Sequence, residues 1–476
     1  MKTLNFSTNR EIVTDVLVAG GGVAGCAAAL AAARHGARVV LIESGGTLGG
    51  SAGIGIVTPL DAVSARDGGR HFGGLIKEFC TDIAEAGEKY CFNDNPEKKH
   101  FSLGSPHVTK YILLKKLVEA GVDIHFHTTL VSAECEDREV KSVAVFDKSG
   151  FCIIKAKSFI DATGDADLIA FSGAEYVLGS EKGVLDSLTE NDLDKRHFSD
   201  EKYAGYSKDG VMQPVSIFFI MGGVDIDEAR KLNNKKLCFG DLGITKEKFE
   251  AWKFAGTCGF EITDDRIPMP QGRVLISRGP REDMAVVNMS RVTGINGADA
   301  DSLNEGEIKA QLQLIAIVDF LQTFIPGFEK SYLIQSANTL GVRETRRLKG
   351  RYVLSGNEAI LCNPLEDRVA RGSYIIDIHD PNGKSAAVGG RIKGDFYDIP
   401  YGCLVAKEYD NLLACGRCIS VDHVAHASTR IQGTCIMTGQ AAGTATAIAL
   451  KENIKPADIN VESLQKILID DGVYLD

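Results

Sequence analysis

Hydrophobic and polar positions fall into blocks at the start of the chain. Residues 16–19 form an uninterrupted apolar run, residues 26–33 are mostly alanine, and residues 39–42 form a second apolar run. Short apolar runs are typical of buried parallel strands, and the small-residue stretch between them favours a helix, which Gly36 would stop. The pattern therefore predicts a strand, a turn, a helix and a second strand that ends at Glu43.

The same patterns recur along the rest of the chain. Apolar residues at helical spacing predict helices over residues 73–83, 110–120 and 308–324, and a small-residue helix over 434–451. Strands are expected over residues 122–130, 158–161, 214–221 and 411–415, with a hairpin from 143–146 and 151–155. From about Ala174 the chain becomes polar and loop-rich, and near Tyr397 it is expected to return to the first domain.

The turn after the first apolar run carries glycines at the spacing of a dinucleotide-binding motif. Gly20 permits a tight turn, Gly22 lets the backbone approach a pyrophosphate, and Gly25 lets the helix pack close to the sheet. Glu43 can accept hydrogen bonds from both hydroxyls of an adenosine ribose, which disfavours a 2′-phosphate. The motif alone fits either NAD or FAD.

Composition narrows the classes of partner. The chain has 476 residues, 44% of them hydrophobic, and a formal net charge of −11, which argues against nucleic acid or an anionic membrane as the main partner. Residues 16–33 and 431–450 lack charge, but glycines interrupt the first and polar residues the second, so neither predicts a membrane span. Because Glu11 and Asp15 precede the first apolar run, no basic secretory leader is expected, and we expect a cytoplasmic location.

The cysteines and acids do not suggest a metal site. Twelve cysteines are scattered without a framework spacing, which is typical of reduced thiols used as small hydrophobic residues. The one CxxC, Cys415-Gly416-Arg417-Cys418, has no second half. Asp165 and Asp167 have no His or Cys partner at a useful spacing, so we expect no metal.

Three later segments favour FAD over NAD. Gly49-Gly50 suits a loop that passes a bulky ring, and residues 161–165 resemble a strand end beside a dinucleotide. The strand end at Gly416-Arg417 is followed by a helix start at Gly433-Thr434. The positive end of that helix can face the pyrimidine C2 carbonyl of a flavin, where negative charge builds on reduction.

These residues together carry a resemblance to a known family. The segments are the N-terminal motif with Gly49-Gly50, Ala162-Thr163-Gly164, and residues 341–347, 399–401 and 412–443. They resemble the bacterial FAD-dependent oxidoreductase family of glutathione-reductase-like flavoproteins, whose FAD domain is similar to that of fumarate reductase and succinate dehydrogenase flavoprotein subunits. The resemblance implies FAD near Gly416, Arg417 and Gly433-Thr434. A second GxGxxG motif and a CxxxxC pair are missing, so an NAD(P)H domain and dithiol chemistry are not expected.

The expected fold class is α/β, a Rossmann-like FAD-binding domain with a discontinuous chain path and an inserted α+β substrate domain. We expect the FAD-binding domain over residues 1–173 and 395–476 and the substrate domain over 174–394. The residues expected to contact FAD are Gly20, Gly22, Val23, Ala24, Gly25, Glu43, Ser44, Gly49, Gly50, Ser51, Val131, Ala162, Thr163, Gly164, Gly416, Arg417, Gly433 and Thr434.

Candidate catalytic groups lie in two clusters. His423 and His426 occupy a predicted loop before the last helix and could act as general base or acid, since an ordinary imidazole pKa lies near neutral pH. Alternatively, they only hydrogen-bond the loop or the flavin. Arg343, in an Arg–Glu cluster, could clamp a substrate carboxylate bidentately, whereas the rest of that cluster is expected to tie the two domains together.

The resulting hypothesis is an FAD-dependent oxidoreductase that transfers a hydride between a small polar metabolite and flavin N5, with dehydrogenation at C–O or C–N favoured. Reduction of an activated C=C bond, as in fumarate reductase, is the alternative. A flavin-dependent tRNA-modification protein and an electron-carrier subunit are two further classes. The expected partners are the substrate and an unidentified electron donor or acceptor, without nucleic acid or membrane, and a homo-oligomer is left open.

Overall fold

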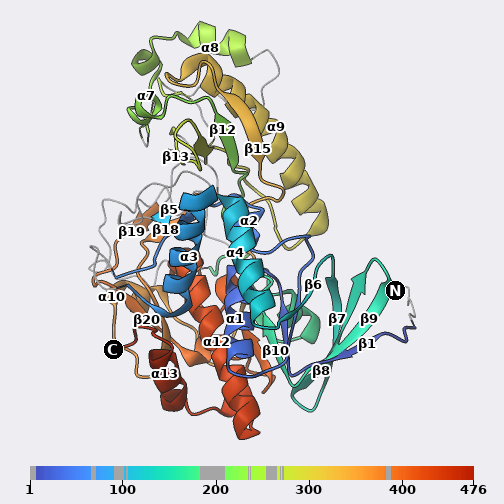
Figure 1. Cartoon of the computed structure of the whole chain (residues 1–476). Coiled ribbons are helices and arrows are strands. Elements are labelled where there is room, and N and C mark those ends of the chain that lie inside the picture. The colour runs from blue at the N-terminus through green and yellow to red at the C-terminus, as the bar shows by residue number, and fades with distance from the viewer. Residues whose placement is uncertain are drawn as a thin grey trace.

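The apolar runs near the start of the chain form the centre of a five-stranded parallel sheet in the computed structural model (Figure 1). Its strands, in order across the sheet, are β21 (Leu412–Ala414), β10 (Ser158–Asp161), β2 (Val16–Ala19), β3 (Val39–Ile42) and β6 (Asp123–His125). Every neighbouring pair is parallel, and all strands except β6 are buried throughout. This is the expected Rossmann-like α/β class.

The structure describes residues 7–65, 71–90, 101–102, 105–182, 209–233, 235, 237–253, 265–267, 270, 273–381 and 388–476. Part of the second predicted domain, including the polar stretch over residues 183–208, therefore lies outside the described residues.

Helices surround the parallel sheet. The longer ones are α1 (Val23–Arg34), α3 (Gly74–Tyr90), α4 (Pro106–Glu119), α12 (Gln432–Glu452) and α13 (Val461–Asp470). The shorter ones are α2 (Gly50–Gly53), α5 (Asp167–Ser172), α10 (Gly356–Leu361) and α11 (His423–Thr429). The helices predicted from Gly73, Lys110 and Thr434 are thus confirmed, with shifted ends. In the described part of the chain, none of the helices is long and apolar enough to cross a membrane.

Helix α1 lies directly against α12 because glycines face its backbone. A Cβ atom at Gly439 would lie 2.2 Å from the carbonyl oxygen of Ala24, and one at Gly443 would lie 2.1 Å from that of Ala28. Such distances leave no room for a methyl group, so the two helices touch backbone to backbone. The alanine-rich run and the C-terminal small-residue helix therefore form one close-packed pair.

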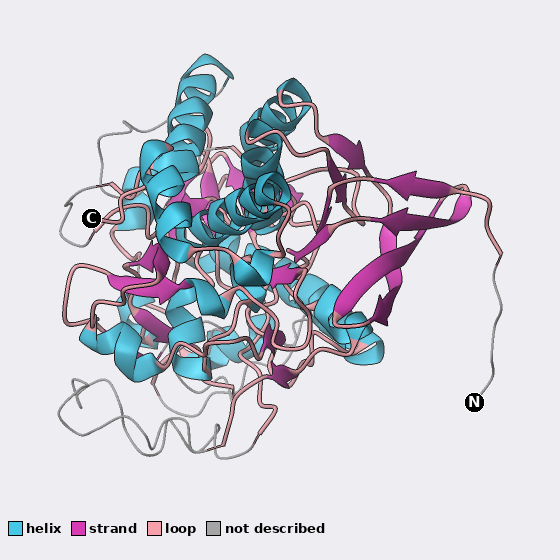
Figure 2. Cartoon of the chain, turned by 90° about the horizontal axis from the view of Figure 1, so that it is seen from below, coloured by secondary structure: helices cyan, strands magenta, loops and turns pink. Residues whose placement is uncertain are grey.

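A second, four-stranded sheet projects from one side of the molecule in both overall views (Figures 1 and 2). Its order is β1 (Glu11–Val13), β9 (Gly150–Lys155), β8 (Glu139–Asp147) and β7 (Thr129–Glu136). The predicted hairpin is confirmed as β8 and β9. The single strand predicted over residues 122–130 is wrong, because His127 takes a left-handed conformation (φ 53°) and splits it between two sheets.

The inserted region forms its own sheet above the first (Figure 1). The sheet order is β13 (Ile276–Arg278), β14 (Ala285–Val287), β12 (Phe219–Gly222) and β15 (Tyr332–Ser336), antiparallel throughout. The helices are α7 (Ile226–Arg230), α8 (Lys246–Lys253) and the long α9 (Ala300–Phe324), with a 3-10 turn at Phe239–Leu242. Phe320 packs edge to face against both Phe249 and Trp252, and the predicted helix over 308–324 contributes Phe320.

The hydrophobic cores show which segments pack with the insert and which pack with the parallel sheet. The core of the insert spans Val215 to Leu340, with Ile56 added from the first domain. Leu348 and Leu354 pack in the cores that also hold residues of β2, and the domain boundary expected at residue 394 stays a prediction. The connecting strands form pairs: β11 (Tyr176–Leu178) with β16 (Arg346–Leu348), β17 (Arg368–Gly372) with β20 (Tyr397–Pro400), β18 (Ile376–Ile378) with β19 (Val388–Gly390), and β4 (Pro59–Leu60) with β5 (Phe101–Ser102).

Replacing Gly439 with alanine should lower the free energy of unfolding by about 1–3 kcal/mol, because the methyl group forces α1 and α12 apart. Gly240→Ala is the control, since a Cβ there would meet no atom within 4 Å in the part of the chain that the structure describes; we expect a change within about 0.5 kcal/mol. Urea unfolding followed by circular dichroism measures both variants. Equal stability of the two variants would contradict the direct contact of the helices.

Candidate functional site

The glycines of the turn after β2 have two different roles. Gly20 has φ 104°, and a Cβ there would lie 2.5 Å from the Ala162 carbonyl oxygen; one at Gly25 would lie 1.9 Å from the Gly20 carbonyl oxygen. The protein's own packing therefore requires both glycines. At Gly22, which precedes α1 and has φ −67°, a Cβ would meet no atom of the described residues within 4 Å. Open space at an uncapped helix N-terminus fits a pyrophosphate.

Glu43 joins this turn to the next loop. One carboxylate oxygen accepts the Gly21 amide at 2.8 Å, and the other accepts the Gly45 amide at 2.7 Å. The oxygen that accepts the Gly45 amide also accepts the Ser44 hydroxyl at 3.3 Å, whereas the other oxygen keeps a second acceptor direction that suits a ribose hydroxyl. The predicted Ser44 is exposed beside it, and the Thr128 amide donates to the Glu43 carbonyl at 3.0 Å just before β7.

The predicted double glycine packs beside the same turn. The Gly49 amide donates to the Gly21 carbonyl at 2.8 Å, and a Cβ at Gly50 would lie 3.1 Å from the Gly22 Cα. Ser51 follows in α2. Val131, also predicted to contact the cofactor, is 37% exposed on β7, and its role stays a prediction.

The end of β10 meets the end of β21. The buried Asp161 carboxylate accepts the Thr163 amide at 3.0 Å and the Thr163 hydroxyl at 2.7 Å, while burial raises its pKa to about 6. A Cβ at Gly164 would lie 3.1 Å from the Arg417 guanidinium, which donates to Asp165 at 2.7 Å. These contacts bring the predicted Ala162–Gly164 and Gly416–Arg417 segments together.

The N-terminus of α12 closes the arrangement. A Cβ at Gly433 would lie 2.5 Å from the Asp61 carbonyl oxygen, so the chain passes over the helix start. The Thr434 hydroxyl and the Gln432 side-chain carbonyl oxygen are buried with no hydrogen-bond partner among the described residues. Buried orphan polar atoms call for a partner, and the polar pyrimidine edge of a flavin supplies donors and acceptors for them.

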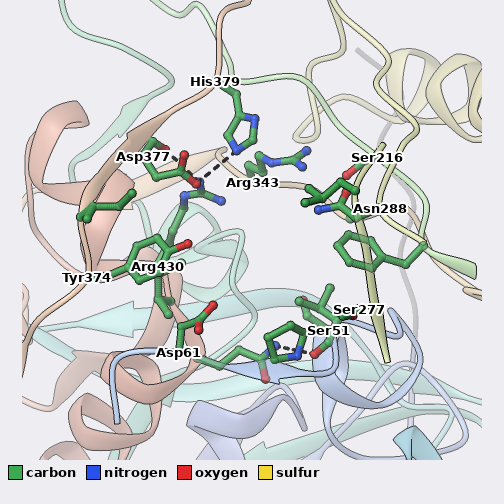
Figure 3. Close-up of a pocket in the computed structure, with 18 of the residues that line it drawn as sticks. Ser51, Asp61, Ser216, Ser277, Asn288, Arg343, Tyr374, Asp377, His379 and Arg430 are labelled. Atoms are coloured by element: carbon green, nitrogen blue, oxygen red, sulfur yellow. Dashed lines mark hydrogen bonds and ion pairs between the residues drawn. The ribbon is translucent and has the colours of Figure 1, made fainter. Parts of the chain in front are cut away.

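A cavity of about 1120 Å³ opens beside these residues (Figure 3). The FAD-binding part contributes Ser51, Asp61, Arg417 and Gln432, and the insert contributes Ser216, Ser277 and Asn288. A volume of this size accommodates a flavin ring and a small ligand together.

A hydrogen-bonded row of charged groups forms one wall of the cavity. The Arg430 guanidinium donates to the Asp377 carboxylate at 3.2 Å, and the His379 ring lies 3.2 Å from the same carboxylate oxygen. The other His379 nitrogen lies 2.8 Å from the Arg291 guanidinium. Burial, reinforced by Arg343, lowers the pKa of His379 to about 3, so the imidazole is neutral near pH 7.

The predicted catalytic residues fall in two places. Arg343 lines the cavity and donates to the Pro214 carbonyl at 2.6 Å. His423 and His426 are fully buried, and neither lines this cavity. The predicted loop that carries them is the helix α11.

The carboxylate of Glu344 lies between the rings of His423 and His426 and the Arg347 guanidinium. Its buried carboxylate lies 2.7 Å from the His423 ring and also pairs with Arg347. Although burial opposes ionisation, His423 and Arg347 hold the pKa of Glu344 below its ordinary value. Burial lowers the pKa of His426 well below its ordinary value, so it is neutral. This part of the Arg–Glu cluster is a buried ionic network, whereas Arg343 faces the cavity.

Sequence reasoning missed Asp377, His379, Arg430, Asp61 and Tyr374. Asp377 lies on the short strand β18, and His379 directly follows the end of that strand, but nothing in the sequence places the strand at the cavity. No cluster of three His, Cys, Asp or Glu side chains suited to a metal ion occurs within the described ranges.

The chain matches a known protein family over most of its length. A family model described as FAD dependent oxidoreductase matches residues 15–468. A search of curated proteins gives no significant match.

Several solved structures are similar at low identity. A geranylgeranyl bacteriochlorophyll reductase-like protein from Thermoplasma acidophilum is 14% identical, with 97% of this chain and 84% of that chain covered and a TM-score of 0.44. The p-nitrophenol 4-monooxygenase PnpA from Pseudomonas putida DLL-E4 is 10% identical, with 97% and 85% covered and a TM-score of 0.43. The myxobacterial chondrochloren halogenase CndH is 10% identical, with 96% and 78% covered and a TM-score of 0.42. We draw no conclusion about activity from them.

Gly22→Ala should keep the unfolding free energy of the apoprotein within about 1 kcal/mol of the wild type. It should raise the Kd for FAD at least about 10-fold, because the methyl group enters the space before α1. Gly25→Ala is the contrast, since its Cβ would meet the Gly20 carbonyl at 1.9 Å and should destabilise the apoprotein itself. FAD titration and urea unfolding measure both; undiminished FAD affinity in Gly22→Ala would show that the space is not the cofactor's.

Glu344→Gln should lower the unfolding free energy by about 3–5 kcal/mol, because the buried Arg347 loses a carboxylate partner. The matched control is Glu305→Gln on α9, where the pair with Lys309 is exposed. That control should change stability by less than about 0.5 kcal/mol. Chemical unfolding measures both, and a Glu344→Gln protein as stable as the control would refute the buried network.

Proposed function

Because the chain belongs to the family of FAD-dependent oxidoreductases, whose model matches residues 15–468, we propose that it oxidises or reduces a small polar metabolite in the cavity beside Gln432. The observation that carries the proposal is the position of this cavity. It begins at residues expected to hold the flavin and is walled on the other side by the insert, with Ser216 and Asn288 supplying polar groups. Dehydrogenation at a C–O or C–N bond is the favoured direction.

FAD, when bound, accepts or donates a hydride equivalent through N5. The chain's own residues bind and orient the reactants. The open N-terminus of α1 at Gly22 suits the pyrophosphate, and Gln432 and Thr434 suit the pyrimidine edge. Arg343 orients a substrate from the opposite wall of the cavity.

Proton transfer is assigned to Asp61 in this proposal. A dehydrogenation needs a base near the substrate hydroxyl or amine, and Asp61 and Asp377 are the carboxylates on the described cavity lining. Asp377 is engaged by Arg430 and His379. Asp61 lies beside Gly433 at the start of α12, where the flavin is expected, so the proton is assigned to its carboxylate. His423 and His426 do not line the cavity, so the proton transfer is not assigned to them.

Reduction of an activated C=C bond is the second candidate. Among the arginines that line the cavity, Arg343 and Arg430 suit the carboxylate of an alkene substrate. Burial raises the pKa of Tyr374, so its phenol keeps a proton that it could donate. Arg343→Ala should weaken reactions of carboxylate-bearing substrates in either direction. The two candidates are separated by whether a metabolite bleaches the oxidised flavin or reoxidises the reduced flavin.

A screen of small metabolites under anaerobic conditions should identify compounds that bleach the flavin of the yellow holoenzyme. Asp61→Asn should slow that bleaching by about 10²–10⁴-fold, because the amide cannot accept the proton. FAD content and bleaching by dithionite should stay unchanged, and Asp283→Asn, an exposed carboxylate on the insert, serves as the control.

Two results would contradict the proposal at different levels. A chain that takes up no FAD, or that no metabolite reduces or reoxidises, would end the proposed function. Full-rate bleaching in Asp61→Asn would leave the function standing and remove Asp61 as the proton acceptor.

A further inference from the structure

The described lining of the cavity carries an excess of positive charge. Its charged residues are Arg273, Arg343, Arg391, Arg417 and Arg430, against Asp61 and Asp377. Arg417 is neutralised by Asp165, which is not part of the lining, and Arg430 shares Asp377 with the other groups of the wall. A cavity lined mainly by one sign of charge attracts ligands of the opposite sign, so this one favours an anion.

Arg430 is the lining arginine with the clearest unused capacity. Its side chain is 10% exposed, and one terminal nitrogen donates to the Asp377 carbonyl at 3.0 Å and to the carboxylate at 3.2 Å. Its Nε is buried and has no hydrogen-bond partner among the described residues. Figure 3 shows the guanidinium beside Asp377 and Arg343 at the cavity. A buried unpaired donor on a planar fork calls for an anionic acceptor.

The remaining groups of the wall hold Arg430 in place. Arg291 can only donate, so the His379 nitrogen at 2.8 Å from it, Nδ1, accepts and carries no proton. The proton then lies on Nε2 and is donated to the Asp377 carboxylate at 3.2 Å. Burial opposes ionisation of Asp377, but His379, Arg430 and Arg343 hold its pKa below the ordinary value. The row therefore fixes an ionised Asp377 against Arg430.

We propose that the cavity binds the carboxylate of a small hydroxy or amino acid through Arg430 and Arg343, and that His379 is a positioning residue that holds Asp377 against Arg430. The inference rests on the proposed function, because it names the substrate class of the same cavity. Asn288 lines the cavity, and its buried Oδ1 has no partner among the described residues, so it suits a hydroxyl or amino donor. Asp61 and Asp377 disfavour a dianion such as phosphate.

The test measures binding without turnover. 2-Hydroxyisobutyrate has no hydrogen on its α-carbon, so it cannot be dehydrogenated there, and its amide is a neutral analogue of nearly the same shape. In calorimetric titrations of the holoenzyme, the acid should bind at least about 10-fold more tightly than the amide. Arg430→Gln should raise the Kd of the acid about 10-fold and leave that of the amide nearly unchanged. Arg281→Gln, at a position 71% exposed on the insert, should alter neither.

The role of His379 has its own readout. His379→Leu should weaken binding of the acid but not of the amide, while FAD content and thermal stability show that the protein is folded. His379→Gln can still donate to Asp377 and accept from Arg291, so it should recover most of the affinity. A leucine variant that binds the acid as the wild type does would remove the positioning role.

Three results would overturn the substrate class. They are equal binding of acid and amide by the wild type, tighter binding of inorganic phosphate than of the acid, and an Arg430→Gln variant that loses both ligands equally. The first two results come from the wild-type protein, so they test the proposal even if a variant does not fold. A chain that lacks FAD would fail the proposed function instead, and calorimetry on that chain would still report the acid preference.

Discussion

The direct contact between α1 and α12 is the constraint on which the rest of the structure depends. Gly439 and Gly443 have no side chain because the carbonyl oxygens of Ala24 and Ala28 occupy that space. The contact joins the first and last thirds of the chain, so the glycine turn at one end and the helix start at Gln432 at the other belong to one site. The insert then needs only to cover the open side, which it does with residues such as Ser277 and Asn288.

Two ionic networks attach the insert to this frame with different consequences. The network of Glu344 is fully buried and positions α11, so its charges serve packing and domain attachment. The row that includes His379 reaches the cavity and leaves donor capacity on Arg430. Gln213 bridges the two: it donates to Glu344 at 3.4 Å and accepts the backbone amide of His379 at 3.1 Å. The cavity wall is therefore hydrogen-bonded, through Gln213, to the buried network of Glu344.

The sequence could predict those structural features that depend on residues close together in the chain. The strand–turn–helix unit and the hairpin were predictable because periodicity and glycines act locally, and the family resemblance added the expectation that Gly416 and Arg417 lie near FAD. The strand over residues 122–130 failed because a single left-handed residue, His127, redirects the chain. Sequence reasoning singled out Arg343 within residues 343–347, but the pattern does not show which side of the chain faces a cavity, because successive side chains of an extended backbone point to opposite sides. Only the tertiary fold decides that Arg343 meets the cavity and Glu344 the buried histidines.

An experimental structure of the protein with FAD tests the central claim most directly, because the claim is that the two ends of the chain build one cofactor site. The account predicts density for the pyrophosphate at the N-terminus of α1 beside Gly22. It also predicts the pyrimidine edge of the flavin at Gln432 and Thr434, with one face of the ring open to the cavity that Arg430 lines. A flavin ring bound away from the start of α12, or a pyrophosphate away from Gly22, would contradict it.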